Sequence, residues 1–395
     1  MRHLIGFCFV LVVILQGLAG CSSTPTSARI QVGAERSELY LPLLHNKKVA
    51  LVVNQSSRVA EQHLLDYLLA QQVNVVRIFA PEHGFRGDHD AGAHVNNDID
   101  QQTGIPITSI YGKNKKPAKQ LMDEVDVVVF DIQDVGARFY TYISSMHYMM
   151  EAAAETGTAF IVFDRPNPNG KFVDGPILEP AFRSFVGMHP IPVLHGMTLA
   201  ELALMIKGER WINQADDLNL STISIANYRR DKPYVLPIAP SPNLPNSQAI
   251  QLYPSLCFFE ATPVSIGRGT DFPFQVMGHD KVALGSFTFT PTSRPGAALH
   301  PKLEGKLSQG IDLRSSNIHG LDLQLFIQAH QQFAQQQQNF FEHADFMDKL
   351  AGTDKLRLAI EQGQSLEQIR LSWQSGLQKF RQQRRPYLLY PDLVP

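Results

Sequence analysis

Four short, almost uninterrupted apolar segments in the first half of the chain constrain the fold more than any other feature. They are "KKVALVVN" (47–54), "VNVVRIF" (73–79), "VDVVVFD" (125–131) and "TAFIVFD" (158–164). The segments between them include "EQHLLDYLLAQQ" (61–72) and "FYTYISSMHYMMEAAAETG" (139–157), whose apolar residues recur with helical spacing. Apolar strands that alternate with helices are typical of a parallel sheet covered on both faces. We therefore predict a Rossmann-like, doubly wound α/β fold.

The remaining segments predict a second, smaller α+β domain. "TLAELALMIKGE" (198–209) adds one more helix to the first domain, because Thr198 and Glu201 have the spacing of a capping box. The passage 231–248 holds five prolines and marks a domain border. Beyond it, "SFTFTP" alternates like a strand, whereas "DLQLFIQAHQQFAQQQQ" and "LEQIRLSWQSGLQKFRQQ" predict helices. We place the Rossmann-like domain at 39–250 and the C-terminal domain at 251–395.

The N-terminal segment 1–20 predicts an export signal. Arg2 and His3 precede an apolar run that ends in "LAGC" (18–21). Small residues before a cysteine are typical of bacterial lipoproteins, in which Cys21 would be acylated. A plain membrane anchor and an ordinary cleavage site are the alternatives. Ser22 and a polar tether over 21–38 favour a periplasmic protein that a lipid anchors to the outer membrane.

Composition and motifs argue against several partners. The formal net charge is −2 and no basic stripe is present, so we expect no nucleic-acid partner. The turn "NQSSRVA" after the first strand lacks the G-x-G-x-x-G pattern of dinucleotide-binding folds, and we expect no cofactor. Cys8 and Cys21 belong to the leader, which leaves Cys257 without a partner for an intramolecular disulfide. The sequence does not indicate an oligomeric state.

Each predicted strand ends in a polar cluster. The clusters are "NQSSR" (54–58), "APEHGFRGDHD" (80–90), "DIQDVGARFYTY" (131–142) and "DRPNPNG" (164–170). Ligands bind outside the carboxyl ends of the strands in open parallel sheets. Four such clusters at one edge therefore predict an active site there. Pro81, Gly84 and Gly87 could alternatively serve only to shape a turn.

Acid–base chemistry is the first hypothesis for this edge. Glu82 directly follows a buried strand, and partial burial would raise its proton affinity so that it could act as a general acid. Asp131, Asp134 and Asp164 would supply further carboxylates, and glycoside hydrolysis uses two. The nearby arginines suit an anionic substrate, and Tyr140 could flank a sugar ring.

Structural roles are the alternatives for several of these residues. Asp131 or Asp164 could cap the next helix. Arg138 and Arg165 could form ion pairs with those aspartates. Tyr140 fits the start of a helix equally well.

A metal site is the rival chemistry. His83, His89, Asp90 and His94 could together bind a metal in a hydrolase that acts on an amide or a phosphoester. Their spacing matches no H-x-H or H-E-x-x-H pattern, and Arg86 lies among them, where its charge opposes metal binding. We therefore expect no metal.

Four longer motifs resemble one bacterial family. "PEHGFRGD", "DIQDVGARFYTY", "DRPNPNG" and "LYPSLCFFEATPVSIGRGTDFPFQ" have the order seen in the exo-acting β-N-acetylmuramidases, formerly a domain of unknown function. The resemblance extends from about residue 40 to the C-terminus. It implies a Rossmann-like domain and a smaller C-terminal domain with the site in the cleft between them. It also implies release of N-acetylmuramic acid (MurNAc) from its β-linkage to N-acetylglucosamine (GlcNAc) at non-reducing ends of peptidoglycan fragments, in cell-wall turnover or recycling.

The same resemblance implies roles for particular residues. Glu82 is the expected catalytic carboxylate, with Asp131 and Asp164 beside it. The expected substrate-binding residues are His83, Arg86, Asp134, Arg138, Tyr140, Arg165, Asn167, Glu260, Arg268 and Thr270. The run 261–263 reads Ala-Thr-Pro where the family has a Gly-Thr-Asn-like run. A lipoprotein that binds wall fragments without turnover is the non-enzymatic alternative.

Overall fold

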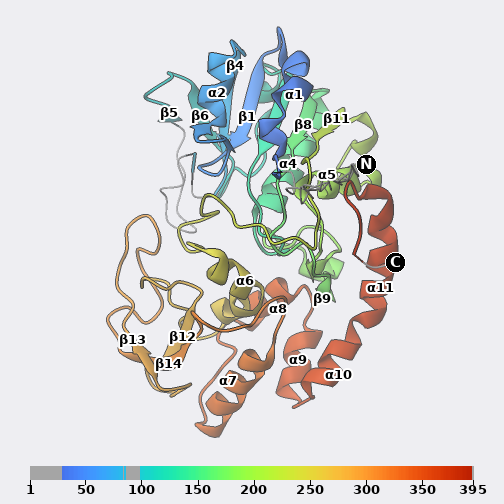
Figure 1. Cartoon of the computed structure of the whole chain (residues 1–395). Coiled ribbons are helices and arrows are strands. Elements are labelled where there is room, and N and C mark those ends of the chain that lie inside the picture. The colour runs from blue at the N-terminus through green and yellow to red at the C-terminus, as the bar shows by residue number, and fades with distance from the viewer. Residues whose placement is uncertain (1–28, 83, 86–97, 394–395) are drawn as a thin grey trace, which may run out of the picture.

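The computed structural model describes residues 29–82, 84–85 and 98–393. A sheet domain and a smaller, mainly helical part lie one above the other (Figure 1). The central sheet has seven strands in the order β11-β8-β7-β1-β4-β6-β5. Their bounds are β1 (Val49–Val53), β4 (Val75–Ala80), β5 (Asp98–Ile99), β6 (Pro106–Ser109), β7 (Val127–Asp131), β8 (Ala159–Phe163) and β11 (Leu220–Ile223).

The strand pairing is that of a doubly wound fold. The strands from β11 to β6 are parallel to their neighbours, and only the edge strand β5 runs antiparallel. Numbered along the chain, the parallel strands have the order 3-2-1-4-5-6 of the Rossmann fold. The predicted fold class is therefore confirmed. The strands β6 and β11 were not predicted, because "PITS" and "LSTI" are short and carry polar residues.

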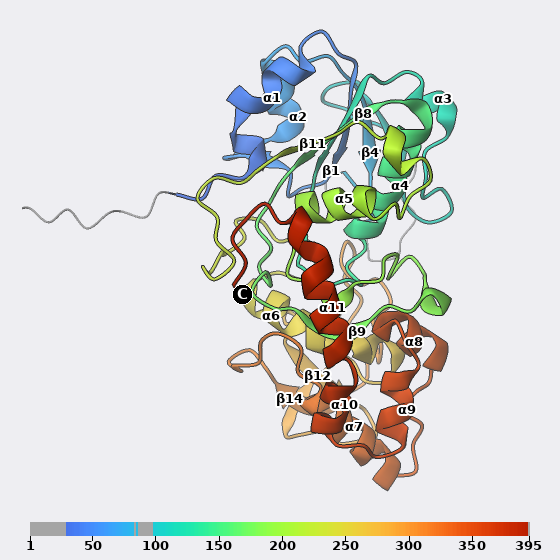
Figure 2. The same ribbon diagram turned by 90° about the vertical axis from the view of Figure 1, so that its right-hand side faces the viewer.

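Helices cover both faces of the sheet (Figure 2). α1 (Ser37–Leu44) and α2 (Leu64–Ala70) pack on the face that presents Val49, Leu51 and Val129. α4 (Tyr142–Thr156) and α5 (Leu199–Gly208) pack on the opposite face, which presents alternate residues of the same strands. The predicted capping box at the start of α5 is present, and Gly157 ends α4 in the left-handed conformation. α3 (Lys119–Met122) is a single short turn.

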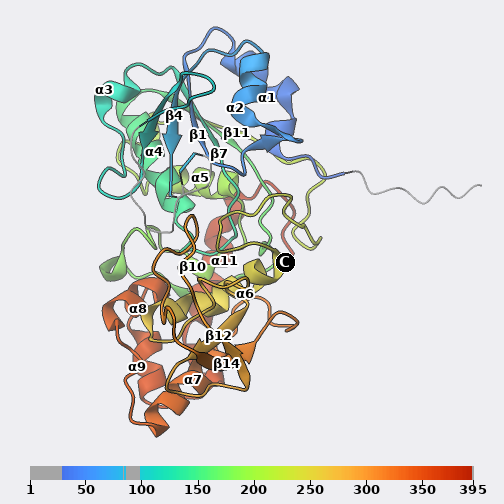
Figure 3. The same ribbon diagram turned by 90° about the vertical axis from the view of Figure 1, so that its left-hand side faces the viewer.

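The second part joins a small antiparallel sheet to a group of helices. α6 (Ser247–Leu256) and the 3-10 helix η4 (Cys257–Ala261) lie between this sheet and the Rossmann-like domain (Figure 3). The sheet has the order β12-β14-β13, with β12 (Val276–His279), β13 (Phe287–Phe289) and β14 (Ser308–Asp312). The helices are α7 (Gln324–Gln335), α8 (Ala344–Ala351), α9 (Lys355–Glu361), α10 (Leu366–Ser372) and α11 (Gln374–Arg384).

The last predicted helix is interrupted. The pattern "LEQIRLSWQSGLQKFRQQ" predicts one helix, but the chain breaks it into α10 and α11 at Trp373. The Trp373 indole is buried and donates a hydrogen bond to Asp174 Oδ1 (3.1 Å), at the start of β9 (Asp174–Ile177). This anchor lies almost two hundred residues away in the sequence, so local periodicity could not reveal it.

The remaining elements are short. β9 pairs with β10 (Pro192–Leu194), and β2 (Arg58–Val59) pairs with β3 (Gln62–His63). The other 3-10 helices are η1 (Gly33–Glu35), η2 (Pro180–Phe182), η3 (Ala215–Asp217) and η5 (Arg385–Tyr387). None of the helices in the described ranges has the length and apolar character that a membrane span requires. Cys21 and the predicted export signal lie outside these ranges.

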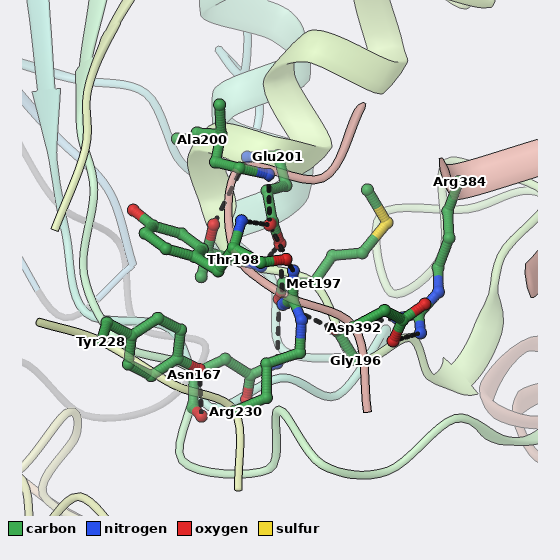
Figure 4. A network of polar contacts seen from close by, with 12 residues as sticks. Asn167, Gly196, Met197, Thr198, Ala200, Glu201, Tyr228, Arg230, Arg384 and Asp392 are labelled. Carbon is green, nitrogen blue, oxygen red and sulfur yellow. Dashed lines mark hydrogen bonds and ion pairs between the residues drawn. The ribbon is translucent and has the colours of Figure 1, made fainter. Parts of the chain in front are cut away.

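The C-terminal segment returns to the Rossmann-like domain. α11 runs upward along the side of the molecule, and the chain after it lies against α5 (Figures 1 and 2). Glu201 accepts hydrogen bonds there from the backbone N–H groups of Leu389 (2.8 Å) and Tyr390 (3.3 Å). Glu201 is also ion-paired with Arg230, and both side chains are fully buried (Figure 4). The last residues of the chain thus complete the first domain.

Candidate active site

A cavity of about 430 Å³ lies where the two parts of the molecule meet. Its volume is within the range of small-molecule sites. The Rossmann-like side contributes loops that follow β4, β6, β7 and η2. The other side contributes the Pro-rich passage, α6, η4, the loops after η4, and α8. The lining residues are Glu82, Tyr111, Phe139, Tyr140, Thr141, Phe185, Val186, Ser241, Asn243, Leu244, Tyr253, Cys257, Glu260, Arg268, Phe274, Phe346 and Leu350.

A tight turn positions Glu82 at this cavity. β4 ends at Ala80, and the N–H of Gly84 donates to the carbonyl of Pro81 (3.0 Å). Gly84 has a φ of +77°, which glycine adopts without strain. Phe85 then enters the core, where its ring meets that of His63 edge-on at 4.9 Å. The turn therefore brings the chain from a buried strand back into the core, with Glu82 half-buried between them.

Two hydroxyl groups hold the Glu82 carboxylate. Tyr111, which follows β6, donates to Oε1 (2.9 Å), and Thr141, at the start of α4, donates to Oε2 (2.6 Å). Burial and the charge of Glu82 raise the pKa of Tyr111 well above its usual value, so this phenol stays protonated. Hydroxyls can accept as well as donate a hydrogen bond. They can therefore orient Glu82 in either protonation state.

The opposite wall carries a second charged pair. Arg268 Nε donates to Glu260 Oε1 (2.7 Å), and each side chain is 25% exposed. The guanidinium lies over the ring of Phe274, 5.0 Å from its centroid. The structure thus brings Glu82, Glu260 and Arg268, which the sequence analysis names as site residues, to one cavity.

Aromatic rings form the surface between the charged groups. Tyr253 packs edge-on against Phe139 (5.4 Å), Tyr140 (5.7 Å) and Phe274 (5.0 Å). Such a wall suits the apolar faces of a sugar ring, while a few charged groups fix its orientation. Cys257 also lines the cavity, and burial raises the pKa of its thiol well above the usual value.

The two other predicted catalytic carboxylates do not reach the cavity. Asp131 is fully buried and forms a two-pronged ion pair with Arg165, with Nε–Oδ1 at 2.6 Å and Nη2–Oδ2 at 2.8 Å. Asp164 is fully buried and accepts hydrogen bonds from Thr198 Oγ1 (2.8 Å) and Ala200 N (3.1 Å) at the start of α5. Asp131 thus has the ion pair given above as its structural alternative, and Asp164 binds the first turn of α5, whose N-cap residue is Thr198.

Two predicted arginines also have structural positions. Arg138 is buried, and its guanidinium donates to backbone carbonyls rather than facing the cavity. Arg165 lines a separate cavity of about 420 Å³ beside Tyr234 and Arg58. Neither arginine is among the residues that line the cavity of Glu82.

Three more predicted binding residues shape loops around the site. Asp134 is buried, and its Oδ1 accepts a hydrogen bond from the N–H of Gly136 (2.6 Å). Burial raises the pKa of Asp134 to about 7. Asn167 packs against Gly136, whose φ is +80°, and donates to the carbonyl of Met197 (2.8 Å) (Figure 4). The Thr270 hydroxyl donates to the carbonyl of Gly267 (2.7 Å) and does not line the cavity.

The remaining predicted residues lie outside the described ranges. These are His83 and Arg86 of the binding set and His89, Asp90 and His94 of the rival metal site. Among the residues that the structure does describe, no three His, Cys, Asp or Glu side chains lie close enough to hold a metal ion.

Several lining residues were not predicted. Thr141 and Tyr253 lie within the quoted motifs, so their motif membership was an available signal. Tyr111, Ser241 and Asn243 had no such signal, because a short unpredicted strand and a proline-rich loop carry them to the cavity.

The fold and the cavity define a protein with a Rossmann-like domain, a second domain and a candidate site where the two meet. Comparison with known families identifies it further. The N-terminal model of the exo-β-N-acetylmuramidase NamZ family matches residues 49–248, and the C-terminal model of the same family matches residues 251–390. The chain belongs to this family of glycoside hydrolases, which confirms the resemblance drawn from the motifs.

Individual relatives agree with this assignment. The chain is 37% identical over 376 residues to the peptidoglycan β-N-acetylmuramidase NamZ of Bacillus subtilis (strain 168), an alignment that covers 89% of each chain. Two crystal structures of DUF1343 family proteins from Bacteroides fragilis NCTC 9343 have the same fold. One has a TM-score of 0.84 and 45% identity, and covers 92% of this chain and 100% of its own. The other has a TM-score of 0.79 and 30% identity, and covers 92% of this chain and 99% of its own.

Proposed function

We propose that this protein removes MurNAc from the non-reducing ends of peptidoglycan fragments such as MurNAc-GlcNAc, with Glu82 as its general acid. The observation that carries the proposal is the position of Glu82, a half-buried carboxylate held by two hydroxyls in a cavity walled by aromatic rings. The exo-β-N-acetylmuramidase family and the Bacillus subtilis relative, a peptidoglycan β-N-acetylmuramidase, support the substrate class.

The chemistry follows from the leaving group. A glycosidic oxygen leaves poorly unless it is protonated, and a positioned carboxylic acid supplies that proton. Tyr111 and Thr141 fix both Glu82 oxygens, so the acid can be aligned with the bond without reorienting its side chain. Fixed orientation of this kind lowers the entropic part of the barrier.

Replacing the acid tests the proposal. Glu82→Gln keeps the shape and the hydrogen bonds but removes the transferable proton, so turnover of MurNAc-GlcNAc should fall about 10²–10⁴-fold. Mass spectrometry of the released monosaccharides measures this, and circular dichroism checks the fold. The loss on a para-nitrophenyl glycoside should be milder, because that leaving group needs little protonation.

Two results would contradict the assignment. Near-normal turnover of the disaccharide by folded Glu82→Gln protein would show that Glu82 is not the general acid. An equally severe loss on both substrates would indicate a nucleophilic or charge-stabilising role. Glu179→Gln is a suitable control, because Glu179 lies on the surface and pairs with Lys355 away from the cavity.

We also propose that the enzyme works in cell-wall recycling from a lipid anchor on the periplasmic side of the outer membrane. The "LAGC" motif after an apolar run supports this location. Cys21→Ala should release the protein from the outer-membrane fraction and abolish labelling by fatty acids. Labelling that persists in the variant would contradict the anchor.

A further inference from the structure

Arg268 is presented to the cavity by a rigid loop. The glycines on either side of it have φ angles of +82° (Gly267) and +78° (Gly269), and a side chain at either position would collide with backbone atoms. The N–H and hydroxyl of Thr270 both bond to the carbonyl of Gly267, at 3.1 and 2.7 Å. Thr292 N donates to the carbonyl of Gly269 (2.9 Å). The loop therefore holds the Arg268 backbone before any ligand arrives.

The guanidinium is also oriented, yet part of it has no partner. Nε is fixed by Glu260, and the planar group lies over Phe274. Within the described ranges, the two Nη groups of Arg268 make no hydrogen bond. Two adjacent N–H donors in one plane match the two oxygens of a carboxylate.

Two cations, Arg268 and Lys302, lie at this wall together with Glu260. Glu260 offsets one charge, but Lys302 lies behind the pair, with Nζ 3.0 Å from the carbonyl of Phe259 and 3.4 Å from that of Glu260. Glu342 also interacts with Lys302, and burial lowers the pKa of that lysine, so Lys302 adds little free positive charge to the wall. Among the described residues that line the cavity, Arg268 is the one cation. An anionic group on a ligand in this cavity would therefore find its cationic partner at Arg268.

MurNAc differs from GlcNAc by a lactyl ether that ends in a carboxylate. We propose that the Nη groups of Arg268 bind this carboxylate and so make the enzyme select muramic sugars over glucosamine sugars. Arg138 and Arg165 have other partners in the fold, so Arg268 is the arginine that the described residues present to this cavity. The inference rests on the proposed function, because it assumes that the muramic ring enters the cavity beside Glu82.

A neutral analogue isolates this contact. The probes are para-nitrophenyl β-MurNAc and the same glycoside with its lactyl carboxylate converted to the primary amide, which keeps the shape and removes the charge. Wild-type enzyme should show a kcat/KM roughly ten- to hundred-fold higher for the acid, the usual effect of a charge-assisted hydrogen bond. In Arg268→Gln, kcat/KM should fall by a similar factor for the acid and change little for the amide.

Control variants separate this role from a structural one. Arg294→Gln removes a surface arginine that pairs with Asp271 (2.6 Å) outside the cavity, and the acid-to-amide ratio should remain that of wild type. Arg268→Lys keeps the charge but cannot hold Glu260 and a carboxylate together, so the ratio should fall to an intermediate value. If Arg268→Gln does not fold, the acid-to-amide ratio of Arg268→Lys still tests the carboxylate contact.

Four outcomes would contradict one of the two proposals. Equal losses on both probes in Arg268→Gln, or an unchanged ratio in Arg268→Lys, would overturn the carboxylate contact. Equal rates on both probes in wild-type enzyme would overturn it as well. If wild-type enzyme cleaved neither the probes nor MurNAc-GlcNAc, the proposed function itself would fail.

Discussion

A single buried side chain, that of Arg138, joins three separate elements. Nη1 donates to the carbonyls of Pro176 (2.9 Å) in β9 and Ile191 (2.8 Å) before β10, and Nη2 donates to that of Leu350 (2.9 Å) in the last turn of α8. The carbonyl end of a helix favours a cation. Burial lowers the pKa of Arg138 to about 9, because little water remains to solvate its charge. The side chain therefore serves packing between the two domains.

We expect Arg138→Ala to destabilise the fold without changing sugar selectivity. The truncation removes a donor from three buried carbonyls, of which that of Ile191 keeps the N–H of Leu178 (3.2 Å), and it opens a cavity. Lost hydrogen bonds and a new cavity each cost a few kcal/mol. A loss of about 3–5 kcal/mol in the free energy of unfolding should appear in urea denaturation. Arg138→Lys should lose less, because an ammonium replaces some of the donors. A variant of normal stability that selectively loses activity on MurNAc substrates would contradict this role.

At the scale of elements, the C-terminal segment acts as a strap on the Rossmann-like domain. The Tyr390 hydroxyl donates to Asp164 Oδ2 (2.6 Å) and accepts a hydrogen bond from the N–H of Ile225 (2.8 Å) after β11. Burial and the nearby carboxylate raise the pKa of Tyr390 well above its usual value, so the phenol remains a donor. The segment thus ties the end of β8 to the edge strand.

Tyr390→Phe should reveal the strength of this strap. Losing the hydroxyl leaves a buried N–H unsatisfied and Asp164 with one donor fewer, which costs about 1–3 kcal/mol. The matched control is Tyr387→Phe, whose hydroxyl meets Glu209 (2.8 Å) at a more exposed position and should cost less. Chemical denaturation measures both variants, and kcat/KM should stay normal, since Tyr390 is not in the cavity lining. Equal stability of wild type and Tyr390→Phe would show that the contact contributes nothing.

Helices and strands were predictable where residues close together in the sequence determine them. The strands β1, β4, β7 and β8 are buried throughout or nearly so, and their continuous Val, Ile and Phe content indicated this. The position of Glu82 followed from the carboxyl-edge rule, since it needs only the end of β4. The partners of Arg138 and Trp373 could not be predicted, because α8 lies 212 residues from Arg138 and β9 lies 199 residues from Trp373. The polar residues of a motif look alike in sequence whether they face a ligand or fill a loop.

At the scale of the whole molecule, one hydrophobic core extends through both domains. It includes Phe130 of β7 and Met146 of α4 in the Rossmann-like domain, and Phe258 of η4 and Phe326 of α7 in the second part. The cavity lies on this shared core, with Glu82 on one side and Arg268 on the other. The relative position of these two side chains therefore depends on the packing that joins the domains.

We predict that the domains unfold together. Separating them would expose the shared core, and the first domain would also lose the Tyr390 and Arg384 contacts of the C-terminal segment. Calorimetry of residues 29–395 should show one transition whose calorimetric and van't Hoff enthalpies agree. The fragment 29–248 alone should lack a cooperative transition and bind a hydrophobic dye. Without the second part, the apolar side chains that pack against it on the α4 and α5 side would be exposed to water. Two resolved transitions in the longer chain, or a sharp transition in the fragment, would mean that each domain is stable by itself and that the geometry between Glu82 and Arg268 has another origin.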